Sequence, residues 1–287
     1  MSLLLPLLPL LAQVGPFNAP VNSTTPLRER PRAAAPAKAA AQADSVPGVR
    51  SARGQACLSA VDADPEEATG TAITWLAEAK GPAAAEAQLC LGLAHSALED
   101  WSEAAAAFSA GRDGAGADRM LRARLGAMAG SALLAGGNAG GALAALDTAQ
   151  ADAKGLASAD LDTDIGLDRA RALVALKRPA DAETALAQVR SMAPTNPEAW
   201  LLSATLARRS GNLKEAQARI ERAAELLPID PEIGLEAGVI AVLAGHDGAA
   251  RKSWESVLVA APDSPAAASA KAYLAQLPAQ VPASRVK

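Results

Sequence analysis

Aromatic residues are scarce in this 287-residue sequence: they make up 2% of it, although half of the chain is hydrophobic. Sandwiches and barrels place Tyr, Phe and Trp on their strands, so the shortage argues against both of these fold classes. The length and the apolar fraction still suffice to bury the cores of one or two domains.

The chain also has only two cysteines, two histidines and a formal net charge of −4. Two cysteines are too few for a disulfide-rich scaffold or for a zinc site built from cysteine. No basic stripe marks a surface for nucleic acid. We therefore predict no nucleic-acid partner, no metal and no cofactor.

The apolar run MSLLLPLLPLL at residues 1–11 is shorter than the roughly 20 residues needed to cross a bilayer. Its length suits a secretory signal, and residues 1–12 are interpreted as one. No Lys or Arg precedes the run and the cleavage site is incomplete, so a disordered or misassigned start is the alternative. Export predicts a periplasmic or secreted protein without a membrane span after processing; otherwise the protein is cytoplasmic.

Residues 13–50 are rich in Pro and Ala and have no periodic apolar face. Proline lacks the amide hydrogen that a helix interior requires, and its recurrence here prevents a long helix. This segment is predicted to be a flexible linker.

The most informative pattern is a period of 34 residues, which separates Pro194, Pro228 and Pro262. Other small residues keep the same interval, and the pattern extends upstream with two short interruptions. The period predicts five repeats: 85–118, 123–156, 163–196, 197–230 and 231–264.

Each repeat has the pattern of two antiparallel helices. In residues 197–230, Gly211 and Asn212 separate two apolar-periodic segments, because both tolerate the left-handed conformation that ends a helix. Pro228 ends the second segment. Neither helix can bury its apolar side alone, so the repeats must stack on one another.

The stack is predicted to cover residues 51–277. It begins with a degenerate helix pair at 53–84 and ends with a single capping helix at 265–277, followed by a flexible tail at 278–287. The fold class is thus all-α.

The 34-residue period, with a few residues at fixed positions in it, resembles the tetratricopeptide repeat family over roughly residues 53–277; those positions hold Trp200, Ala204, Ala216, Ile220, Ala223 and Pro228. The segments CLGLAHS and AWLLSATLARR also resemble exported alphaproteobacterial repeat proteins. The resemblance implies a right-handed α-solenoid of helix-turn-helix repeats, whose first helices line a concave groove that binds peptides or proteins. The chain departs from the family where the first helix usually carries an aromatic residue, as at Ala207 and Ala241.

No pattern in the sequence supports catalysis. His95 and His246 lie four repeats apart and cannot share a metal or a proton relay. The glycine-rich stretches lack the Lys-Ser/Thr pair of a phosphate-binding loop. Acidic residues such as Asp230 and Glu232 fall at helix starts, where negative charge favours the helix dipole. We predict a non-catalytic protein, with an enzyme as the less favoured alternative.

Cys57 and Cys90 are 33 residues apart and fall at nearly the same phase of neighbouring first helices. We predict a disulfide between them, because that phase allows the Cα separation a disulfide needs. Two small buried thiols fit the same positions equally well.

The helical period places one side of each first helix in the groove. The candidate groove residues are Leu167, Arg171, Leu201, Thr205, Arg208, Arg209, Leu235, Val239 and Val242. Three of them form an expected basic cluster, so an apolar or acidic-apolar segment of an unidentified protein or peptide is predicted to bind. Two alternatives stay open: the aliphatic residues pack between repeats with the arginines solvated, or the groove mediates self-association.

Overall fold

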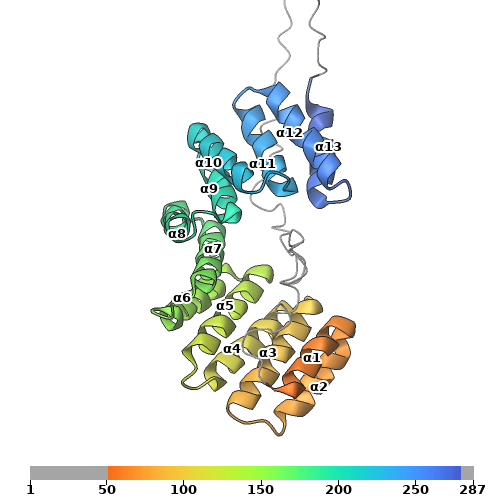
Figure 1. Ribbon diagram of the computed structural model, residues 1–287, viewed down its shortest axis with the longest axis vertical. Helices are drawn as coiled ribbons and strands as arrows, with labels where there is room; N and C mark the ends of the chain where they lie inside the picture. The colour runs from red at the N-terminus through yellow and green to blue at the C-terminus, as the bar shows by residue number, and fades with distance from the viewer. Residues whose placement is uncertain (1–50, 279–287) are drawn as a thin grey trace, which may run out of the picture. The chain divides into compact units, whose positions relative to one another are not determined.

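The computed structural model describes residues 51–278, and its helices are labelled in Figure 1. Within this range the chain forms thirteen α-helices and no strand: α1 (Ala52–Ala63), α2 (Pro65–Leu76), α3 (Pro82–Ala97), α4 (Trp101–Gly114), α5 (Arg119–Ala135), α6 (Ala139–Ala153), α7 (Ala159–Ala175), α8 (Pro179–Met192), α9 (Pro197–Arg209), α10 (Leu213–Leu226), α11 (Pro231–Leu243), α12 (Asp247–Ala260) and α13 (Pro265–Gln276). The predicted all-α fold is confirmed. The signal at 1–12, the linker at 13–50 and nearly all of the tail lie outside the described residues.

The described residues form two compact units. The first comprises residues 51–161 and 171–177, and the second comprises residues 162–170 and 178–278. Helix α7 contributes its middle, residues 162–170, to the second unit and both of its ends to the first. The predicted boundaries of the single solenoid and of its repeats remain predictions.

Local turn chemistry explains where the helices of a pair begin and end. Between α9 and α10, Gly211 has φ +80°, a conformation that only glycine adopts without strain. Asn212 then caps α10, since its side chain accepts a hydrogen bond from the amide of Glu215. Pro197 and Pro231 stand in the first turns of α9 and α11, where their missing amide hydrogen costs nothing.

The two helices of a pair fit together by matching a small residue with a large one. In α3 and α11, a side chain at Gly92 or Gly238 would overlap the ring of Phe108 in α4 or of Trp254 in α12. Gly130 in α5 faces Leu146 of α6 in the same way. These glycines are therefore explained by the close approach of two helices.

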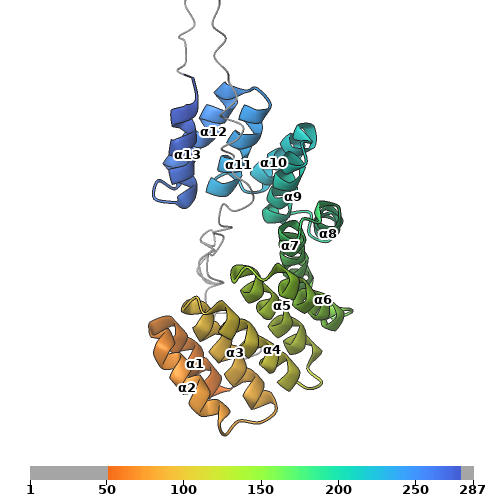
Figure 2. The ribbon, with the colours of Figure 1, turned by 180° about the vertical axis from the view of Figure 1, so that it is seen from behind.

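The core of the first unit is built mainly from alanine. Helices α3, α4 and α5 pack side by side, as Figure 2 shows from behind. Phe108 and Leu125 are fully buried among them, and most of their buried neighbours are alanines. A second cluster around Trp75 joins α1 and α2 to α3.

The second unit adds larger side chains to the same scheme. Ile220 of α10 and Ile233 and Ile240 of α11 form one cluster with the alanines of α9. In the last cluster, the ring centroids of Trp254 and Tyr273 lie 5.2 Å apart, so α13 is packed onto α12. The first helices α9 and α11 thus stand on a rigid apolar base.

Candidate functional site

The best-defined candidate site is formed by the sides of α9 and α11 that carry the predicted groove residues. These helices are the first helices of consecutive repeats and they contact each other. We call their outer surface the α9–α11 face; it consists of Leu201, Thr205, Arg208 and Arg209 on α9 and of Glu232, Leu235, Glu236, Val239 and Val242 on α11.

A buried ion pair joins the two helices of this face. Arg208 donates from Nε and from Nη2 to the two carboxylate oxygens of Glu236, at 2.6 and 3.2 Å. Both side chains are almost buried, at 11% and 12% exposure. Such two-point guanidinium–carboxylate pairing fixes the geometry and neutralises both charges. It therefore fixes the register of α9 against α11.

This pairing alters the expected basic cluster. Arg208 is committed to Glu236 and offers little charge to a ligand. Arg209 also interacts within the protein, and burial together with the charge of Arg208 lowers the pKa of its guanidinium, although Glu236 opposes that shift. Arg171 falls in the stretch of α7 that belongs to the first unit. A common cluster of the three arginines therefore remains a prediction.

The aliphatic residues of the face are half-buried. Leu201 packs against the cluster around Ile220, whereas Leu235, Val239 and Val242 pack against the cluster around Trp254. Part of each side chain is therefore used between repeats, as one of the alternatives proposed. The remaining part keeps contact with solvent and is available to a ligand.

Leu167 is not available, which corrects its assignment to the groove. It is 2% exposed, and it is the fifth residue of its predicted repeat, as Leu89 is in another. Leu89 is 1% exposed and lies in one cluster with Leu121 and Leu125 of the next first helix. In the repeat of Leu89 the fifth position therefore points toward the following first helix, and Leu167 is buried in the same way, whereas Leu201 and Leu235, at the same position of later repeats, stay partly exposed. The helical period alone does not distinguish these two cases.

Glu232 and Glu236 are the residues of this face that the groove prediction did not include, and Glu232 was interpreted from the sequence only as an acid at a helix start. It lies in the first turn of α11 and is exposed, and its carboxylate makes no ion pair or hydrogen bond with any other residue between 51 and 278. Partial desolvation raises the pKa of this carboxyl, and the nearby carboxylates of Asp230 and Glu236 add to the effect. The positive end of the helix dipole explains why an acidic residue is favourable at this position. The carboxylate nevertheless has no cationic side chain as a partner among the described residues.

The two cysteines lie in the first unit. A disulfide joins Cys57 of α1 to Cys90 of α3, with a Cα–Cα distance of 6.2 Å, and both residues are 1% exposed. Close by, the Ser51 hydroxyl and amide donate to the carboxylate of Glu86 at 2.5 and 3.3 Å. The bond thus connects the terminal helix pair to the next repeat.

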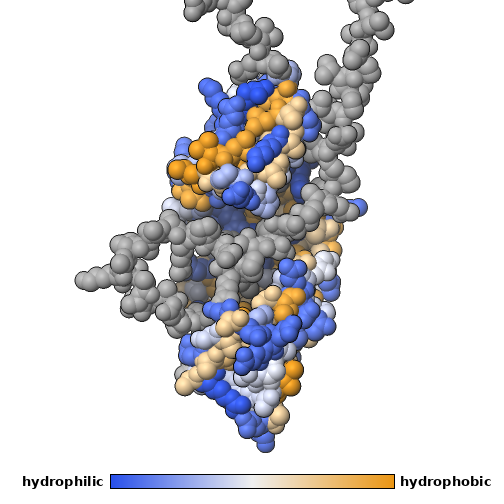
Figure 3. Space-filling view, turned by 90° about the vertical axis from the view of Figure 1, so that its right-hand side faces the viewer, coloured by the Kyte–Doolittle hydropathy of each residue, from blue (hydrophilic) through white to orange (hydrophobic). Residues whose placement is uncertain are grey.

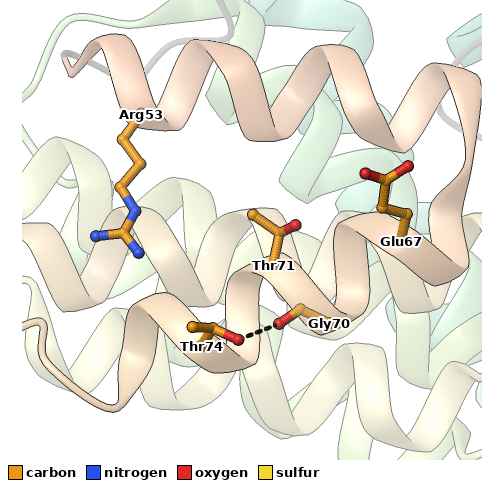
Figure 4. A pocket seen from close by; sticks show the side chains of 5 residues that line it. All are labelled: Arg53, Glu67, Gly70, Thr71 and Thr74. Carbon is orange, nitrogen blue, oxygen red and sulfur yellow. Dashed lines mark hydrogen bonds between the residues drawn. The ribbon is translucent and has the colours of Figure 1, made fainter.

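A shallow polar recess lies between α1 and α2 (Figure 4). Two of its side chains have partners: Arg53 pairs with Glu78 and lies over the Trp75 ring at 5.2 Å, and the Thr74 hydroxyl donates to the carbonyl of Gly70 at 2.9 Å. This is the polar outer surface that a terminal repeat needs for solubility.

Metal-ligating groups are not brought together in the described part of the chain. Residues 51–278 contain no group of three His, Cys, Asp or Glu side chains that could hold a metal. His95 pairs with Asp100 at 3.3 Å, and His246 stands in the turn before α12. None of the described helices is both long enough and apolar enough to cross a membrane.

Comparison with known proteins supports the repeat assignment. The model of the tetratricopeptide repeat family matches residues 163–206. No curated protein sequence matches the chain. Among solved structures, the chain is similar to PilW, a type IV pilus biogenesis factor, with a TM-score of 0.62 and 17% identity over 77% of this chain and 96% of that one.

Two further solved structures show the same similarity. PilF of Pseudomonas aeruginosa has a TM-score of 0.58 and 15% identity, over 79% of this chain and 96% of its own. A thermophilic tetratricopeptide repeat protein of Thermus thermophilus has a TM-score of 0.54 and 18% identity, over 67% of this chain and 97% of its own. At these identities the likeness concerns the fold. The α-solenoid class and the resemblance to the tetratricopeptide repeat family are confirmed.

Proposed function

We propose that this α-solenoid protein, which contains a tetratricopeptide repeat, is a non-catalytic scaffold that binds a segment of another protein on the first-helix surfaces of its repeats. The observation that carries the proposal is the α9–α11 face. It combines partly exposed aliphatic side chains with a charged group that has no partner among the described residues, on two helices joined by the Arg208–Glu236 ion pair. A rigid apolar surface with a few oriented polar groups is what peptide recognition requires.

The comparisons support an interaction role without naming a partner. Tetratricopeptide repeat proteins generally act by binding other proteins, and the similar structure of PilW comes from a pilus biogenesis factor. Export fits the apolar run at residues 1–11 and the cysteine pair, because disulfides persist in oxidising compartments. We therefore propose that the protein is exported to the periplasm or out of the cell.

Site-specific crosslinking tests the proposed function. A photo-crosslinking amino acid in place of Val239 puts the probe at the centre of the α9–α11 face, whereas the same amino acid in place of Glu255 puts it on the exposed side of α12. In the native host, the probe at Val239 is expected to give a discrete adduct with another protein, and the probe at Glu255 is expected to give none.

Two results contradict the scaffold proposal. Equal adducts from both positions would show unspecific contact. An adduct of two copies of this chain from Val239, with a mass in solution that rises with protein concentration, would instead support the self-assembling module that the sequence left open.

A further inference from the structure

We infer that the α9–α11 face binds an aliphatic protein segment that carries a basic side chain, with the basic group beside Glu232. This inference rests on the proposed function and narrows its partner class. It also reverses the sign of the charge that the sequence suggested for that partner, because the arginines of the face are already engaged inside the protein.

The first step concerns the charges of the face. Arg208 and Glu236 neutralise each other in a nearly buried pair. Arg209 has interactions within the protein, and so does Glu198 at the start of α9. Asp230 accepts hydrogen bonds from the amides of Glu232 and Ile233 at the start of α11. The Glu232 carboxylate is the charged group of the face that has no partner among residues 51–278.

The second step concerns the apolar surface beside that carboxylate. Glu232, Leu235, Val239 and Val242 follow one another at steps of three, four and three residues, so they form one stripe along α11. Ten residues of helix extend about 15 Å. An extended peptide covers that length with about five residues, at roughly 3.3 Å each.

The stripe therefore defines a short recognition sequence. One end requires a positive charge, and the rest favours aliphatic side chains that cover the exposed parts of Leu235, Val239 and Val242. Figure 3 shows hydrophobic and hydrophilic patches beside one another on the side of the second unit that is turned toward the viewer. Burying the stripe under an acidic peptide would instead bring two carboxylates together.

Peptide selectivity tests the inference. The probes are three fluorescein-labelled dodecapeptides with acetylated and amidated ends, identical in their aliphatic residues and carrying Arg, Gln or Glu at one fixed position. With the full chain, fluorescence anisotropy is expected to rank their affinities as Arg, then Gln, then Glu, with about a five-fold step between the first two, the size of a partly exposed ion pair.

Variants at Glu232 identify the source of that ranking. Glu232→Gln is expected to remove the preference for the Arg peptide, and Glu232→Lys to reverse it in favour of the Glu peptide. Glu255→Gln, an equal change of charge on the exposed side of α12, is expected to leave the ranking unchanged. A preference that persists in Glu232→Gln, or a wild-type chain that prefers the Glu peptide, overturns the inference.

A second pair of variants tests the aliphatic part. Val239→Ser is expected to weaken all three peptides by about three- to five-fold through lost apolar contact, whereas Val259→Ser, at a valine that is 85% exposed on α12, should change none of them. Equal effects of both variants contradict an apolar stripe at Val239.

Failure of this inference and failure of the proposed function are distinguishable. If no peptide binds the wild-type chain but a probe at Val239 still crosslinks another protein, the inference is wrong and the scaffold function stands. If the probe at Val239 gives no specific adduct, the scaffold function itself fails.

Discussion

The two ends of the described array are secured by different chemistry. At the start, α1 and α2 bury Val61 and Trp75 among alanines, and the Cys57–Cys90 disulfide connects this pair to α3. At the other end, no disulfide joins α13 to the described helices before it. Helix α13 packs through Tyr273 on the ring of Trp254.

The difference follows from how little a terminal helix can bury. A helix inside a solenoid packs on both neighbours, whereas a terminal helix packs on one, so its apolar burial contributes less stability. The start of the array compensates with a covalent bond, which restricts the unfolded chain. The other end compensates with a large aromatic contact, which contributes area and a preferred ring geometry.

In both units an ion pair between an arginine and a carboxylate connects the second helices of successive repeats. In the first unit, Arg112 of α4 reaches Asp152 of α6 at 2.8 Å. In the second unit, Arg219 of α10 reaches Glu183 of α8 at 2.8 Å. The two ends of the described helices are therefore stabilised by different interactions, whereas the interiors of the two units share the same kind of ion pair. Three variants test this comparison.

The largest effect is expected at the aromatic end. Trp254→Ala leaves a cavity between α11, α12 and α13 and removes the hydrogen bond from the indole N–H to the carbonyl of Leu235, at 3.1 Å. Loss of a buried tryptophan costs about 3–5 kcal/mol. Urea unfolding of the full chain should show this loss, with hydrogen exchange rising first in α13.

The matched control is Val259→Ala on the same helix, at a valine that is 85% exposed, and it should leave the midpoint unchanged. A Trp254→Ala chain whose α13 exchanges no faster than that of the control would show that the aromatic contact does not secure this end.

An intermediate effect is expected at the covalent end. The double variant Cys57→Ala/Cys90→Ala removes the bond between α1 and α3 and should cost about 2–4 kcal/mol. Because the bond connects only the terminal pair, exchange should accelerate in α1 and α2 while α12 and α13 are unaffected. Mass analysis of the untreated mature chain under non-reducing conditions is the accompanying measurement, and two free thiols would remove the basis of the prediction.

The helices could be predicted from the sequence because their ends are encoded locally. Proline recurs 34 residues apart at positions 194, 228 and 262, and glycine at positions 211 and 245, and each of these residues affects the backbone only within a few residues of its own position. Phase also placed Cys57 and Cys90 on neighbouring first helices. These inferences need only the spacing along one chain.

The site was harder to predict because its properties depend on neighbouring helices. Arg208 pairs with Glu236, 28 residues away, and this partner follows only when the two helices are placed side by side. Leu167 is buried, whereas Leu201 and Leu235 at the same position of later repeats are partly exposed, a difference that one helical wheel does not contain. Glu232 can be recognised as a carboxylate without a partner among the described residues only once the interactions of the surrounding charged residues are known.

The smallest effect on stability is expected at the Arg219–Glu183 ion pair of the second unit. Burial opposes ionisation of Glu183, but hydrogen bonds from Arg219 and Arg190 outweigh it and hold the pKa of this carboxyl below its ordinary value. A lowered folded pKa means that the stabilisation is present above the pKa of the unfolded chain, about 4.3, and is lost as the pH falls through the folded pKa.

Glu183→Gln should therefore have a lower free energy of unfolding than the wild type at neutral pH, and this difference should disappear at acidic pH. Because Glu183 is 37% exposed, solvent screening limits the difference to less than about 1 kcal/mol. Unfolding free energies at pH 7 and pH 3 measure it, with Glu225→Gln as control, since Glu225 pairs with Arg222 at 65% exposure. If the gap between Glu183→Gln and the wild type is the same at both pH values, the arginines orient Glu183 without depending on its charge. Packing rather than charge would then stabilise the interior of the second unit, as it does at the end that carries Trp254 and Tyr273.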